Sequence, residues 1–123
     1  MNPWLFLSGV LAIIPGVAHG YLGEKQLIGP LLSAENVQGV LRSKVSRNIL
    51  RGVWHLPAAS WGLMGLMTIY YSFTPYPPVA PIAFAISTCS VALLVNLAAT
   101  KGKHIGWPLL LVVSLLAVVG LYT

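Results

Sequence analysis

Hydrophobic positions fall in four continuous runs along this chain. The runs cover residues 3–22, 52–72, 79–99 and 105–122, and none of them contains Asp, Glu, Lys or Arg. Each run is close to the ~20 residues that a helix needs to cross ~30 Å of hydrocarbon. The pattern predicts an all-α fold, namely an integral membrane four-helix bundle that forms a single transmembrane domain over residues 1–123.

The composition agrees with a membrane protein. Hydrophobic residues make up 57% of the chain and charged residues only 7%, with a mean hydropathy of +0.83. A soluble domain usually carries about 25% charged residues, so these few charges could not cover a surface that faces water. The single cysteine, Cys89, excludes an intramolecular disulfide and any CxxC-type redox or metal motif.

The basic residues predict how the helices are oriented. Both the second connector and the two tails lack Lys and Arg, whereas the first connector (23–51) and the third hold all seven: Lys25, Arg42, Lys44, Arg47, Arg51, Lys101 and Lys103. By the positive-inside rule these two connectors are cytoplasmic and both termini lie outside. We expect the bilayer to be a bacterial inner (cytoplasmic) membrane. The one-sided charge also argues against a dual-topology transporter.

The long cytoplasmic connector shows a helical pattern of its own. Apolar residues recur at fourfold spacing after Ser33, a candidate N-cap, at Val37, Leu41, Val45 and Ile49. This predicts a basic amphipathic helix that lies at the membrane interface or extends the second span below it. Contacts with anionic lipid headgroups or a partner protein are expected from Arg42, Lys44, Arg47 and Arg51. The alternative is a purely topological role for these residues, and no nucleic-acid partner is expected.

Polar side chains that could bind a metal or transfer a proton lie near the cytoplasmic ends of the runs. They are His19 and Glu24 near the end of the first run, His55 near the start of the second and His104 beside the fourth. Ionisable groups at membrane depth are costly unless they are paired, face the bundle interior or serve a function. Their shared depth makes this end of the bundle the candidate site.

Two neighbouring histidines of this kind suggest cofactor chemistry. His19 and His55 could ligate a haem iron axially, and Glu24 or His104 could complete a transition-metal site, because imidazole and carboxylate suit such metals. Without a metal the cluster could relay protons. Alternatively, each histidine only makes a hydrogen bond between helices. The residues leave both the identity of a cofactor and its presence open.

Glycines affect how the end of the first run is interpreted. His19 and Glu24 are five residues apart, about 140° around an ideal helix, so they do not share a face of a continuous helix. Gly20 and Gly23 predict that the helix ends between His19 and Glu24. Arg51 could pair with Glu24 across the interface. Gly9, Gly16 and Gly20 lie at helical spacing and are expected to pack closely against a neighbouring helix.

Three functions remain compatible with these residues. The leading expectation is an accessory or assembly subunit of a larger membrane complex, with other membrane subunits or further copies of the chain as partners. The second is a haem- or metal-binding redox protein or enzyme with its site at the cytoplasmic leaflet. The third is a small transporter or channel. Whether the chain is an enzyme at all is not decided by the sequence.

Overall fold

The computed structural model describes residues 1–34 and 38–123, which are helical and contain no strand. The elements are, in chain order, α1 (Pro3–Gly23), a π-helical turn (Glu24–Ile28), α2 (Gly29–Ser33), a 3₁₀ turn (Gly39–Arg42), α3 (Lys44–Ser72), α4 (Val79–Thr100) and α5 (Gly106–Tyr122). The predicted all-α fold with four principal helices is confirmed.

Local chemistry explains several helix ends. The side chain of Asn2 caps α1 by accepting the backbone N–H groups of Trp4 and Leu5, each at 3.1 Å, and Pro3 occupies the first helical position. Farther along the chain, α4 ends where Lys101 and Gly102 adopt positive φ values of 51° and 76°. A left-handed residue of this kind ends a helix.

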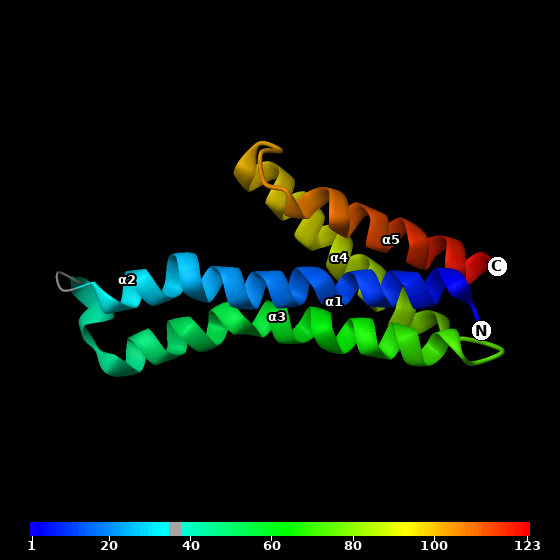
Figure 1. Ribbon diagram of the computed structural model, residues 1–123, viewed down its shortest axis with the longest axis horizontal. Coiled ribbons are helices and arrows are strands. Elements are labelled where there is room, and N and C mark those ends of the chain that lie inside the picture. The colour runs from blue at the N-terminus through cyan, green and yellow to red at the C-terminus, as the bar shows by residue number, and fades with distance from the viewer. Residues whose placement is uncertain (35–37) are drawn as a thin grey trace.

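The helices form two antiparallel pairs. Figure 1 shows α1 beside α3, and α4 and α5 as a hairpin that diverges from α1 and α3 toward its own connector. The two pairs meet near the end of the molecule that carries both termini, where α5 lies along α1. Two clusters of buried side chains form this junction: Leu5, Ile82 and Ala117 in one, and Ala12, Cys89, Leu110 and Val113 in the other.

The expected end of the first helix is wrong. The helix does not end at Gly20 or Gly23. Glu24 keeps helical angles (φ −62°, ψ −49°), and the helix continues through the π-helical turn to Ser33. Gly23 and Gly20 instead allow close contact with α3, as described below. A glycine is able to serve either purpose, and its local sequence does not distinguish them.

The connector also differs from the predicted amphipathic helix. Ser33 is the last residue of α2 rather than an N-cap. In the described residues 38–43 the chain forms only the 3₁₀ turn, with a positive φ of 64° at Gly39 and an extended Ser43 before α3. In agreement with the alternative prediction, the helix of the second apolar run extends back into the connector, because α3 begins at Lys44. Val37 of the predicted apolar stripe lies outside the described residues.

Two helices within the described part of the chain are long and apolar enough to cross a membrane. They are the continuous helix Pro3–Ser33, with 31 residues, and α4, with 22 residues. The apolar helix α5 is shorter, at 17 residues, and α3 has 29 residues but carries Lys44, Arg47 and Arg51 in its first turns.

Candidate functional site

Backbone contact between α1 and α3 positions the candidate residues. A Cβ atom placed on Gly9 would lie 2.6 Å from Gly65 O, and one placed on Gly65 would lie 2.6 Å from Gly9 O. A second close approach is at Gly16, where a Cβ would lie 2.8 Å from Ala58 O, and the fit is looser at Gly20, 3.3 Å from Ala58 Cβ. Glycine therefore sets the distance at which the side chains of α1 reach α3.

Glu24 joins the end of α1 to α3 through both of its carboxylate oxygens. Oε1 lies 3.0 Å from Arg51 Nη2, and Oε2 lies 3.1 Å from His55 Nε2. This contains the Arg51–Glu24 ion pair that the sequence allowed. The three side chains are between 34% and 47% exposed, so solvent screens the ion pair, and such pairs contribute about 0.2–1 kcal/mol.

His19 and Trp54 form a second link between the same helices. The rings are stacked, with centroids 4.5 Å apart and planes 13° from parallel. His19 Nε2 donates to Trp54 O at 3.2 Å, and Trp54 Nε1 donates to His19 O at 3.4 Å. The indole also covers Gly23, where a Cβ would lie 2.6 Å from Trp54 Cε2. The ring of Trp61 lies nearly perpendicular to that of His19, with the centroids 5.5 Å apart.

The two links lie on opposite flanks of the glycine stripe. At about 100° per residue, His19 and Glu24 project roughly 60–80° to either side of the mean direction of Gly16 and Gly20. The glycines face α3 directly, so a side chain on each flank still reaches it. The expected angular separation of His19 and Glu24 is thus compatible with both residues contacting the same helix.

A π-helical turn begins at Glu24. The N–H of Gly29 donates to Glu24 O five residues earlier, and a Cβ on Gly29 would lie 2.8 Å from that oxygen. Beyond the turn, Ile28 and Leu32 are only 2% and 5% exposed. Single π-helical turns are frequent at functional sites, and this one adjoins the carboxylate that binds Arg51 and His55.

The hydrogen bonds identify one protonated nitrogen in each of two histidines. Carbonyl and carboxylate oxygens accept, so Nε2–H is the donor in both His19 and His55. A metal would therefore have to be bound through Nδ1 of each ring. The observed geometry therefore uses these two rings to hold α1 against α3, and the haem and metal assignments stay predictions.

His104 lies apart from the other candidate ligands. It belongs to the α4–α5 connector, which is distant from the end of α1 in Figure 1. Its Nδ1 accepts the N–H of Gly106 at 3.0 Å and contacts Asn96 Nδ2 at 3.2 Å. Across residues 1–34 and 38–123, no three His, Cys, Asp or Glu side chains are grouped so that they could hold a metal ion.

The basic residues of the connector differ in what they contact. Arg47 is bound within the chain, donating to Leu41 O at 2.8 Å, Leu32 O at 3.1 Å and Arg42 O at 3.3 Å. It fastens the end of α2 and the 3₁₀ turn to α3. Arg42 and Lys44 are exposed, and Arg51 pairs with Glu24 as described. Exposed Arg42 and Lys44 are therefore better placed than Arg47 to meet a lipid headgroup.

A hollow of about 600 Å³ lies at the opposite end of the molecule, among residues 1–4, 74–77 and 120–123. Trp4, Tyr76 and Tyr122 line it, and none of its lining residues is Asp, Glu, Lys, Arg or His. Asn2 ties the surrounding segments together, because its N–H donates to Ser72 O and its Nδ2 to Gly120 O, at 2.6 and 2.7 Å. Exposed aromatic rings of this kind are typical of a membrane–water interface.

Sequence reasoning missed the role of Trp54 and Gly23. Gly23 suggested a helix end, and nothing in the sequence linked it to Trp54, which stands directly before His55. Their contact depends on the register of α1 against α3, which becomes visible only once Gly9 and Gly65 are seen to meet. A glycine and a tryptophan more than thirty residues apart give no local signal of such a contact.

Comparisons with known proteins add no identity to this geometry. No protein-family model, curated protein or solved structure matches the chain.

Proposed function

We propose that this chain is an integral membrane protein that acts as an accessory or assembly subunit of a larger membrane complex. In this proposal four helices cross a bacterial inner membrane, both termini lie outside and the two basic connectors are cytoplasmic. Docking to another membrane chain is assigned to the α4–α5 hairpin.

The outward face of α4 carries this proposal. The most apolar 18-residue segment of this helix has a mean hydropathy of 2.1, yet only 17% of that segment is buried within the chain. The core helix of a soluble protein would be mostly buried, so the apolar surface of α4 needs another cover, either lipid or protein. Ser87 lies within an exposed stripe that runs along the helix: Ala80, Phe84, Ser87, Val91, Leu94 and Ala98. Small and hydroxyl residues on an apolar helix are typical of contacts between helices in membranes.

The distribution of charge supports the proposed orientation. With the antiparallel arrangement of the helices, all seven basic residues fall toward the end that carries α2 and the α4–α5 connector. The opposite end, with both termini and residues 73–78, has none. A bilayer between these ends places the positive charges on one side, where anionic lipid headgroups are the expected partners of exposed Arg42 and Lys44.

The candidate site favours a structural role over catalysis. Each of the four polar residues contacts a residue on the opposite helix: His19, Glu24, Arg51 and His55. These contacts hold α1 and α3 together as one unit, from which the hairpin diverges. A unit of this kind suits a subunit whose task is to hold a partner.

Topology provides the first test of the proposal. In a Cys89→Ala background, which has no other cysteine, Lys103→Cys should react with a membrane-impermeant maleimide only in inverted vesicles. Tyr76→Cys should react only in intact spheroplasts, because residues 73–78 are assigned to the outside. The same labelling pattern for both positions would contradict the orientation. Extraction of the protein by carbonate would contradict membrane insertion.

Partner capture provides the second test. Native-membrane purification in mild detergent should recover a second membrane protein at a constant ratio to the wild-type chain. Ser87→Leu, which keeps α4 apolar but alters its outward face, should lower that ratio at least about fivefold, equivalent to about 1 kcal/mol. The control Val17→Leu changes an exposed position of α1 (65% exposed) and should not.

Recovery of the wild-type chain only as a monomer or homo-oligomer would contradict the accessory role. A Soret absorption band or a stoichiometric metal in the purified protein would instead support the redox alternative at His19 and His55.

A further inference from the structure

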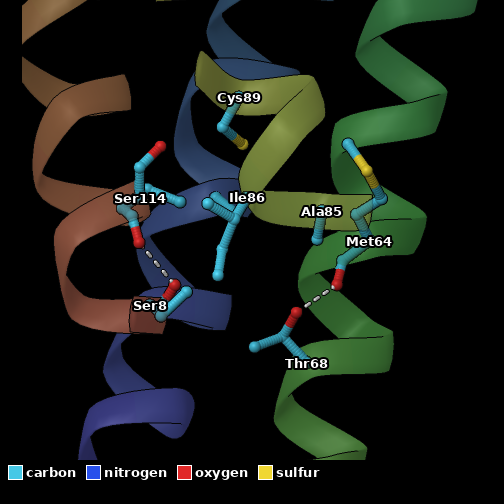
Figure 2. Close-up of a pocket in the computed structure, with 10 residues that line it drawn as sticks. Ser8, Met64, Thr68, Ala85, Ile86, Cys89 and Ser114 are labelled. Atoms are coloured by element: carbon cyan, nitrogen blue, oxygen red, sulfur yellow. Dashed lines mark hydrogen bonds between the residues drawn. The ribbon is translucent and has the colours of Figure 1, made fainter. Parts of the chain in front are cut away.

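One polar side chain from each of the four principal helices lies around a small cavity in the core. The residues are Ser8 on α1, Thr68 on α3, Cys89 on α4 and Ser114 on α5, and all of them are less than 8% exposed. The cavity has a volume of about 10 Å³. Figure 2 shows these side chains together with Met64, Ala85 and Ile86 around the cavity.

The three hydroxyl groups have used their donors. Thr68 donates to Met64 O at 2.8 Å and Ser114 to Leu110 O at 2.9 Å, both one turn back in their own helices. Ser8 donates across to Val113 O of α5 at 2.8 Å. Each hydroxyl has one proton and two acceptor lone pairs, so the three oxygens keep unused acceptor capacity. The thiol of Cys89, a weak donor, is the other polar group that lines the cavity.

We propose that this cavity is the binding site of one water molecule, which donates hydrogen bonds to at least two of the hydroxyl oxygens of Ser8, Thr68 and Ser114. A water needs about 10–15 Å³ of this kind of volume and two to four polar partners, and the site meets both requirements at their lower limits. Water matches the chemistry because it supplies two donors to a group of acceptors. The inference does not depend on the proposed function.

The position of the water would make it part of the junction between the two helix pairs. Ser8 and Thr68 belong to the α1–α3 pair, and Ser114 belongs to the hairpin. The direct bond from Ser8 to Val113 O crosses the same junction. A water bound to Ser114 and to Ser8 or Thr68 adds a second polar connection beside this bond.

A matched pair of substitutions tests the site. Thr68→Val and Thr88→Val each remove a hydroxyl that bonds one turn back in its own helix, at 2.8 and 2.9 Å, but Thr88 does not line the cavity. With a bound water, Thr68→Val should lower the thermal midpoint in detergent by about 2–5 °C, while Thr88→Val leaves it nearly unchanged. Without a water, Thr68→Val should be neutral or stabilising, because a methyl group replaces a buried hydroxyl.

A structural measurement gives an independent result. A crystal structure in which other buried waters are visible should show one ordered water within hydrogen-bond distance of two of the three hydroxyl oxygens. The proposal is overturned by a cavity without density in such a structure, or by a Thr68→Val protein as stable as Thr88→Val.

Discussion

Replacing Gly65 by alanine should destabilise the protein, although alanine is the better helix former. The new methyl group would begin 2.6 Å from Gly9 O and 2.7 Å from Ile13 Cγ1, so α1 and α3 must move apart along their shared contact. Overpacking of this kind costs about 1–3 kcal/mol, and the helix propensity of alanine returns about 1 kcal/mol. We expect the thermal midpoint in detergent to fall by about 5 °C, and Gly65→Leu to prevent accumulation of folded protein.

Gly62 provides the matched control for this substitution. It lies in the same helix less than one turn away, and a Cβ placed on it would meet nothing within 4 Å. Gly62→Ala should therefore be neutral or raise the midpoint, since only the helix propensity changes. Equal midpoints for Gly65→Ala and Gly62→Ala would show that the backbone contact between α1 and α3 does not exist as described.

Trp54→Ala should be the most damaging single change at the candidate site. It removes the stacked partner of His19, the hydrogen bond to His19 O and the indole that covers Gly23. Truncation of a fully buried aromatic side chain costs about 3–5 kcal/mol. Trp54 is only half-buried, so we expect about 2 kcal/mol, measured as a thermal midpoint lower by about 5–10 °C.

Two further variants separate the parts of this effect. Trp54→Phe keeps an aromatic ring against His19 but removes the Nε1–H donor, so its midpoint should lie between those of the wild type and Trp54→Ala. Leu56→Ala removes an exposed apolar side chain from the same turn (65% exposed) and should have little effect in detergent. A Trp54→Ala protein as stable as Leu56→Ala would contradict the role of Trp54 in joining the helices.

The helix boundaries were predictable from the sequence where strong local signals exist. Asn2 and Pro3 mark the start of α1, the proline-rich segment 75–78 separates α3 from α4, and the residues around Gly102 end α4. At these positions the local backbone preference and the hydrophobic pattern agree. The end of the first helix failed because Gly20 and Gly23 are required by the contact with α3, which their neighbours in the sequence do not reveal.

The candidate site was predictable in its members but not in its connections. The shared depth of His19, Glu24 and His55 followed from the lengths of the apolar runs, and Arg51 was a plausible partner of Glu24. The pairing of Glu24 with His55, and of His19 with Trp54, depends on the rotation and register of α1 against α3. Backbone contact at Gly9 and Gly65 sets that register. The two glycines are fifty-six residues apart, and the local sequence around them does not predict that they meet.

The π-helical turn at Glu24–Ile28 shows how the helix accommodates one extra residue. It accommodates one residue more than an α-helical turn, which shifts the following side chains back by about 100°. Ile28 and Leu32 thereby return to within about 40° of the mean direction of Gly16 and Gly20, whereas in an unbroken α-helix they would lie about 100–140° away from it. The segment behaves as a single-residue insertion that the helix has absorbed. A homologue lacking one residue here would have a regular α-helix with the same buried face, and an alignment of the two chains would place its gap between residues 24 and 28.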